Sequence, residues 1–235
     1  MVKTTKPFTK YDRRFMGLAI GLARRGLGNT WPNPAVGCVL VRPDLGTADN
    51  GGRIVGRGWT QPGGRPHAET QALGRAGDLA KGATAYVTLE PCCHTGKTGP
   101  CTQALIGAGV ARVVVAMEDP DPRVAGQGLA ELKEASVGVD LGLDEDQARE
   151  VNAGFIKRVT EGRPLVSLKA ASSLDGRIAA AGGDSKWVTS GAARARGHLM
   201  RAQSDAILVG IGTVLADDPE LTCRLPGMED RSPAR

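Results

Sequence analysis

The stretch from Pro66 to Cys101 constrains this chain more than any other feature of its 235 residues. His67 can supply an imidazole nitrogen, and Cys92 and Cys101 can supply two thiolates. A zinc site that performs hydrolysis uses about three protein ligands and leaves one position for water. Glu69, placed just after the histidine in a His-x-Glu pattern, can face that water without binding the metal. The stretch therefore predicts a catalytic zinc site.

Zinc-dependent base deaminases divide the roles in this way, with a His and two Cys as ligands and a Glu as proton carrier. Their cysteines usually follow a C-x-x-C spacing, whereas the spacing between Cys92 and Cys101 is longer. One alternative is a closed structural zinc site on Cys92, Cys93, His94 and Cys101. Closed sites favour tighter spacing, adjacent cysteines rarely reach one ion, and Glu69 would have no role. A motif that binds no metal is the remaining alternative.

Composition narrows the class of protein further. Hydrophobic residues at 41% are sufficient for a core, and aromatic residues at 3% are too few for a surface that stacks on many bases. The net charge of +5 suits a small phosphorylated substrate. No apolar run reaches the ~18 residues of a membrane helix, and no secretory signal is present. Five cysteines, an odd number, argue against a disulfide framework. We therefore predict a cytoplasmic protein that binds neither nucleic acid nor membrane.

Periodicity and turn residues predict an alternation of strands and helices up to residue 158. The predicted strands are 36–41, 53–59, 84–89, 112–116 and 137–141, and the predicted helices are 12–25, one starting near 67, 102–109, 127–135 and 144–158. This alternation is typical of a layered α/β domain. A helix-breaking Gly-Arg-Pro sequence after Glu161 places a boundary between domains 1–160 and 161–235.

The second domain begins with a new pattern. Strands are predicted at 165–171 and 206–210, with a helix at 191–202 between them. These elements are too few to bury a full second core.

Several motifs occur together along the chain. They are Pro32-Asn33-Pro34 with the apolar run to Val39, His67-Ala68-Glu69, Glu90-Pro91-Cys92 through Cys101, Asp119-Pro120-Asp121-Pro122, Ser173-Leu174-Asp175-Gly176-Arg177, Ser185 to Thr189, and Gly210 to Thr222. From about residue 12 to the end, the chain resembles the bifunctional riboflavin-biosynthesis deaminase/reductase family. The resemblance implies a cytidine-deaminase-like three-layer α/β/α domain followed by an incomplete dihydrofolate-reductase-like α/β domain.

The resemblance also implies roles for individual residues. In the first domain, zinc would bind His67, Cys92 and Cys101, and Glu69 would act as general acid and base. Asn33 and Lys97 would contact the substrate, Lys97 at its phosphate. In the second domain, the family's NADP contacts fall on Ala171, Trp187, Thr213 and Asp217. Its sugar-phosphate contacts fall on Ser185, Arg201, Leu221 and Arg224.

Asn33 is also a candidate from its local sequence. Two flanking prolines hold the loop extended, and an amide offers a donor and an acceptor to a pyrimidine edge. The alternative is an ordinary turn asparagine.

The implied reaction is hydrolytic deamination of 2,5-diamino-6-(5-phosphoribosylamino)pyrimidin-4(3H)-one, followed by NADPH-dependent reduction of the ribosyl chain. Two other functions remain open: deamination of a different base, either free or in tRNA, and a non-enzymatic zinc-stabilised module that binds RNA through its basic first 25 residues.

Three departures from the family matter. Relatives carry a His where this chain has Trp59 or Thr60, and many carry a Ser at Cys93. The reductase half stops before the family's later strands and glycine-rich NADP loop, so we expect a C-terminally truncated, impaired reductase. An exposed half-domain also favours association into a homo-oligomer.

Overall fold

The computed structural model describes residues 7–235 except 48, 97 and 123. The chain divides into two compact units, residues 1–165 and residues 166–235. Within the described ranges, no helix has the length and apolar character needed to cross a membrane.

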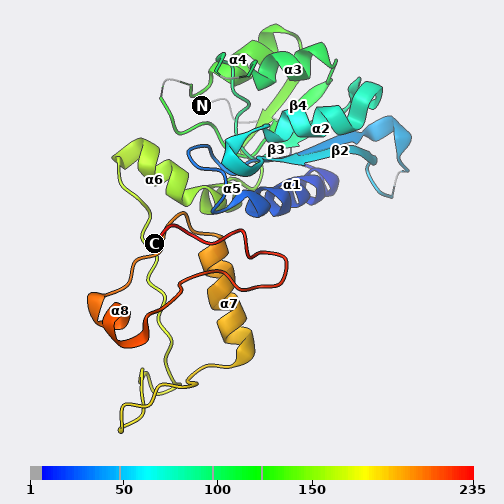
Figure 1. Ribbon diagram of the computed structural model, residues 1–235. Coiled ribbons are helices and arrows are strands. Elements are labelled where there is room, and N and C mark those ends of the chain that lie inside the picture. Colours follow the sequence, from blue (N-terminus) through cyan, green and yellow to red (C-terminus); the bar gives the residue numbers. More distant parts are fainter. Residues whose placement is uncertain (1–6, 48, 97, 123) are drawn as a thin grey trace. The chain divides into compact units, whose positions relative to one another are not determined.

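A five-stranded sheet in the order β2-β1-β3-β4-β5 forms the centre of the first unit (Figure 1). Strand β1 (Gly37–Arg42) pairs antiparallel with β2 (Arg53–Trp59) and with β3 (Thr84–Val87). Strands β3, β4 (Arg112–Val115) and β5 (Gly138–Leu141) run parallel. The three inner strands are buried and mostly apolar, as expected for strands covered on both faces.

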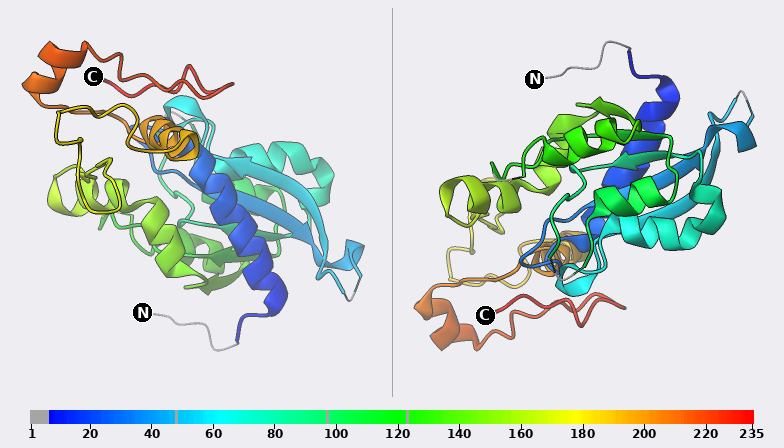
Figure 2. Two further views of the ribbon diagram at one scale, coloured as in Figure 1. Left: turned by 90° about the horizontal axis from the view of Figure 1, so that it is seen from below. Right: turned by 90° about the horizontal axis from the view of Figure 1, so that it is seen from above.

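Helices cover both faces of this sheet (Figures 1 and 2). Helices α1 (Lys10–Ala23) and α5 (Glu145–Val151) lie on one face. Helices α2 (Ala68–Ala76), α3 (Cys101–Gly107) and α4 (Gln127–Glu134) lie on the other. The predicted three-layer α/β/α domain is confirmed. Its core includes the fully buried side chains of Phe15, Met16, Ile20, Leu40, Leu105, Met117, Leu132 and Leu143.

Helix α2 lies unusually close to strand β2 because two glycines face it. A Cβ atom on Gly58 would lie 2.1 Å from the Ala68 carbonyl oxygen, and one on Gly56 would lie 2.3 Å from that of Ala72. The two glycines alternate along the strand, so both point to the same face of the sheet. This close packing fixes the start of α2, where His67 and Glu69 lie.

On the other face of the sheet, Asp12 joins α1 to β3 and β4. Its carboxylate accepts hydrogen bonds from the Thr9 backbone and hydroxyl, the Tyr86 hydroxyl (2.8 Å) and Arg112 Nη1 (2.7 Å). Burial raises the pKa of Asp12, but the bonds from Thr9, Arg112 and Tyr86 outweigh it and hold the pKa below its usual 3.8. The ionised carboxylate is therefore part of the folded structure.

The predicted helix 144–158 is wrong in one respect, because two helices occupy this region. Helix α5 ends at Val151, and α6 (Ala153–Glu161) begins after Asn152. The Asn152 amide is buried, accepts from the Ala35 N–H (2.9 Å) and donates to the Ala35 carbonyl (3.1 Å). The residue between the two helices is therefore held by a tertiary contact. Helical periodicity could not predict this break, because it depends on a partner far away in the sequence.

The second unit contains α7 (Gly191–Ala202), as predicted, and α8 (Ile211–Asp217). The strands predicted at 165–171 and 206–210 are wrong: the first forms no ladder, and Ala206 makes only an isolated bridge to Ala234. The side chains of Leu168 and Leu208 are more than nine-tenths exposed. A strand exists only with a hydrogen-bonded neighbour, and the described part of this unit provides none for these segments.

The close approach of α2 to β2 can be tested with a pair of variants. We expect Gly58→Ala to destabilise the protein by about 1–3 kcal/mol, because the new methyl group would overlap helix backbone. Gly74→Ala, on α2 itself, has open space and should be neutral or stabilising by up to about 1 kcal/mol. Urea unfolding measures both. Equal stability of the two variants would contradict this packing.

The Asp12 network predicts a pH dependence. Because the pKa of Asp12 is depressed on folding, its contribution is present above pH 3.8 and is lost as the pH falls through the folded pKa. We expect Asp12→Asn to cost about 2 kcal/mol or more at pH 7. The difference between wild type and variant should shrink below about pH 4 in urea unfolding. A difference that stays constant down to pH 3 would argue against the ionised network.

Candidate metal centre and active site

Three potential metal ligands meet at the carboxyl end of β3. His67 is the N-cap residue of α2, Cys92 follows β3 after a short loop, and Cys101 is the first residue of α3. The carboxyl ends of parallel strands and the starts of the helices that follow them usually lie at the same edge of an α/β sheet, where such folds place their chemistry.

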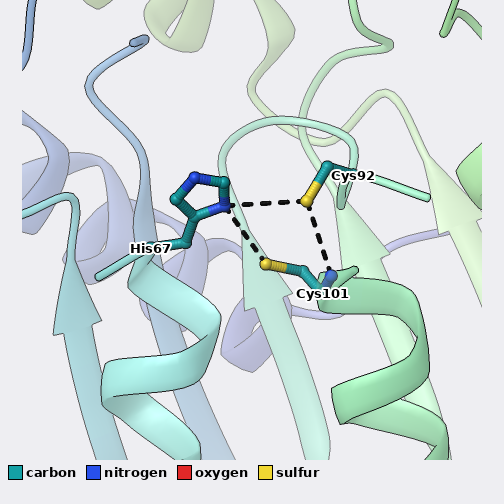
Figure 3. A group of neighbouring side chains, drawn as sticks. All are labelled: His67, Cys92 and Cys101. Atoms are coloured by element: carbon teal, nitrogen blue, oxygen red, sulfur yellow. Dashed lines mark hydrogen bonds between the residues drawn. The ribbon is translucent and has the colours of Figure 1, made fainter. Parts of the chain in front are cut away.

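The ligand atoms converge closely (Figure 3). His67 Nδ1 lies 3.6 Å from Cys92 Sγ and 3.4 Å from Cys101 Sγ, and all three atoms lie within 4.8 Å of one another. Tetrahedral zinc with ordinary Zn–S and Zn–N bond lengths would place sulfur and nitrogen ligands about 3.5 Å apart. The donor set and its spacing therefore fit zinc. The cluster identified among the described residues has three members, which suits an open coordination site.

The two cysteines differ in their protonation. The Cys101 thiol and His67 stabilise a thiolate at Cys92 against the effect of burial and lower its pKa to about 4. The backbone N–H of Cys101, at the start of α3, also donates to Cys92 Sγ at 3.4 Å. The neighbouring Cys92 thiolate and burial raise the pKa of Cys101. A divalent cation between the sulfurs would stabilise both as thiolates.

Glu69 lies beside this cluster in the first turn of α2. Its side chain is only 3% exposed, and burial, followed by the Cys92 thiolate, raises its pKa to about 7. The negative charge of Glu69 favours a higher pKa at both His67 and Cys101. A buried carboxyl group in this position can both accept and donate a proton near neutral pH.

Asn33 lies on the other side of the His67 ring. Its amide nitrogen donates to the Gly64 carbonyl at 3.0 Å and lies 3.4 Å from His67 Nε2. The structure thus places Asn33 beside the predicted ligand His67, close enough to contact a molecule bound at the cluster. Lys97, the other predicted substrate contact, lies outside the described residues.

Comparison with known families agrees with this geometry. Residues 9–117 match the cytidine and deoxycytidylate deaminase zinc-binding region, and residues 164–235 match the RibD C-terminal domain. The chain is homologous to RibD proteins over 95% of its length. The riboflavin biosynthesis protein RibD of Escherichia coli is 52% identical over 223 residues, which are 95% of this chain and 59% of that protein.

Two solved RibD-family structures resemble this one closely. RibD from Acinetobacter baumannii is 51% identical with a TM-score of 0.80, covering 92% of this chain and 58% of the other. The deaminase/reductase of Thermotoga maritima is 44% identical with a TM-score of 0.82, covering 92% and 60%. The chain thus spans about three fifths of the length of the curated relatives it matches. The resemblance inferred from the motifs is confirmed.

In the RibD C-terminal part, the predicted residues fall into separate groups. Arg201 on α7 donates to the Thr222 carbonyl at 2.9 Å, and Arg224 Nη1 lies 3.2 Å from the Thr222 hydroxyl. Burial, followed by the charge of Arg224, lowers the pKa of Arg201. These two guanidinium groups and Leu221 are therefore brought together, and Thr213 and Asp217 share α8. No hydrogen bond between described residues joins Ser185, Ala171 or Trp187 to either group.

Thr60 and Trp59, where the family resemblance implies a His, have structural roles here. The Thr60 hydroxyl is buried and accepts from the Val36 N–H at 2.9 Å, which ties it to the start of β1. The guanidinium groups of Arg25 and Arg75 lie over the Trp59 ring, at 5.1 and 5.3 Å from its centroid.

Two residues near the site were not predicted from the sequence. Arg65, which precedes the Pro-His sequence, donates to the Thr98 hydroxyl at 2.7 Å and brings a positive charge beside the metal cluster. Glu90 is buried directly before Pro91-Cys92. A glutamate in an otherwise apolar strand end was the available signal, because a buried carboxylate needs several hydrogen-bond donors.

The ligand set can be tested by metal analysis after dialysis against a weak chelator. We expect about one zinc per chain in wild type and in Cys93→Ser, because Cys93 is outside the cluster. Cys101→Ser should retain little zinc, since a hydroxyl replaces a thiolate ligand. Loss of zinc from the Cys93→Ser variant would instead favour the closed structural site.

Proposed function

We propose that the first unit catalyses zinc-dependent hydrolytic deamination of 2,5-diamino-6-(5-phosphoribosylamino)pyrimidin-4(3H)-one, a step of riboflavin biosynthesis. The observation that carries this proposal is the convergence of His67, Cys92 and Cys101 with the buried carboxyl group of Glu69 beside them. Three protein ligands leave room for water, and a carboxyl group that does not bind the metal can move protons.

In this mechanism His67, Cys92 and Cys101 would hold the zinc ion. When bound, zinc supplies a Lewis acid that makes water more acidic. Glu69 accepts the proton of the attacking water at its carboxylate and delivers it to the departing amino group. Burial of Glu69 keeps bulk water away from this transfer and holds the carboxyl group in place.

Asn33 would orient the pyrimidine. Its amide nitrogen donates to the Gly64 carbonyl and lies beside His67, so its oxygen, which accepts no hydrogen bond from another described residue, can face a ring edge. Lys97 would contact the phosphate, as the family resemblance implies. The positive charge of Arg65 supports an anionic substrate at this edge of the sheet, because a nearby cation raises the local concentration of anions.

The second unit would contribute to NADPH-dependent reduction of the ribosyl chain. Ala171, Trp187, Thr213 and Asp217 would contact the cofactor, and Ser185, Arg201, Leu221 and Arg224 the sugar phosphate. The proximity of Arg201 and Arg224, the latter also paired with Glu220 at 2.7 Å, supports the second assignment, since two guanidinium groups can bind one phosphate.

The test of the deaminase proposal is ammonia release from the named substrate by protein of known zinc content. We expect Glu69→Gln to keep its zinc and to lose about 10²–10⁴-fold in turnover, because the amide cannot carry the proton. Glu134→Gln, exposed at the end of α4, is the control and should match wild type.

Two outcomes would count against the proposal. Near-normal turnover by the zinc-loaded Glu69→Gln variant would remove Glu69 from the mechanism. Zinc-loaded wild type that releases ammonia only from a free base or from tRNA would favour the other deaminase function.

A further inference from the structure

Glu90 is the most completely hydrogen-bonded carboxylate near the metal cluster. It follows β3, is only 3% exposed, and precedes the ligand Cys92 with Pro91 between them. Its two oxygens accept four backbone N–H groups. The donors are Asp119 (3.1 Å) and Gly126 (3.0 Å) to Oε2, and Gly128 (2.9 Å) and Leu129 (3.2 Å) to Oε1.

These donors belong to α4 and to the loop before it. Gly126 is the N-cap residue of α4, and Gly128 and Leu129 lie in its first turn, whose N–H groups have no partner within the helix. The Glu90 carboxylate therefore caps α4 from a distant part of the sequence. A negative charge is also favoured at this end of the helix dipole. With both oxygens satisfied, the side chain has one defined orientation.

The backbone beyond Glu90 is held against the same helix. A Cβ atom on Gly128 would lie 2.2 Å from the Pro91 carbonyl oxygen, so α4 packs directly on that peptide. The Cys92 carbonyl accepts from the Thr102 N–H at 3.2 Å, and the Thr102 hydroxyl contacts Glu131 of α4 at 2.5 Å. The segment that carries the Cys92 thiolate is thus fixed on both sides by α4 and α3.

We propose that Glu90 is a positioning residue for the metal centre, which acts by locking the Glu90–Cys92 segment onto α4 and so setting the direction of the Cys92 sulfur. Glu90 touches neither the metal ligands' donor atoms nor the substrate in this role. The inference rests on the ligand set of the proposed deaminase, but not on its substrate or turnover. Groups that orient metal ligands commonly change metal affinity by about 10–100-fold when they are altered.

The test replaces zinc with cobalt(II) in the full chain and uses two readouts: the absorption bands of cobalt–thiolate bonds, and the rate of cobalt loss to a chelator. We expect Glu90→Gln to shift the bands and to lose cobalt at least about tenfold faster. The amide nitrogen would face backbone N–H donors, so two of the four bonds would be lost.

Asp12→Asn is the matched control. Asp12 is an equally buried, multiply hydrogen-bonded carboxylate on the opposite face of the sheet, beneath α1. We expect it to lose stability but to keep the wild-type bands and the wild-type rate of cobalt loss. If Glu90→Gln also loses only stability and matches wild type in both readouts, Glu90 is not a positioning residue.

Gly128→Ala provides a second variant should Glu90→Gln not fold. Its methyl group would push on the Pro91 carbonyl and, less closely, on the Glu90 side chain, without removing the carboxylate, and it should also shift the cobalt bands. Unchanged bands in a folded Gly128→Ala protein would overturn the inference. A wild type without cobalt–thiolate bands would overturn the ligand set itself, whereas normal bands without ammonia release would overturn only the proposed substrate.

Discussion

The site depends on one geometric requirement: three soft ligand atoms from separate segments must meet within 4.8 Å. Neither α2, the loop after β3 nor α3 can meet it alone. The requirement is satisfied because β3 ends where α2 and α3 begin, and because glycines on β2 allow α2 to approach the sheet at backbone contact distance. The packing of α2 against β2 therefore sets the distance between His67 and the two cysteines.

Charge is arranged differently on the two faces of the sheet. Beneath α1, Asp12 is paired with Arg112, and its ionised form contributes to folding. At the metal cluster, burial raises the pKa of Glu69 to about 7, and the Cys101 thiol and His67 lower the pKa of Cys92 to about 4. The first arrangement stabilises the folded chain. The second keeps groups ready to bind a cation and to exchange protons, a perturbation typical of functional sites.

The fold of the first unit was largely predictable from sequence because its signals are local. Strand β2 and helix α7 have the predicted bounds, and the His-x-Glu and Pro-Cys motifs contain the three residues whose potential ligand atoms converge. The break at Asn152 and the role of Glu90 were not predictable, since both depend on partners far away in the chain: Ala35 for one, and the start of α4 for the other. Periodicity reports which residues prefer a helix or strand, not which distant backbone groups they meet.

In the second unit, local sequence predicted strands that the structure does not form. Apolar segments at 165–171 and 206–210 have the composition of strands, yet in the described structure they pair with no neighbouring strand. The sequence by itself determined the element types of the first unit, the family, and the residues able to bind zinc, because these follow from residue chemistry and local spacing. Only the tertiary structure decided which strands form, where α5 ends and how Cys92 is held. These features depend on hydrogen bonds and close packing between residues far apart in the chain, and local sequence does not indicate which of them meet.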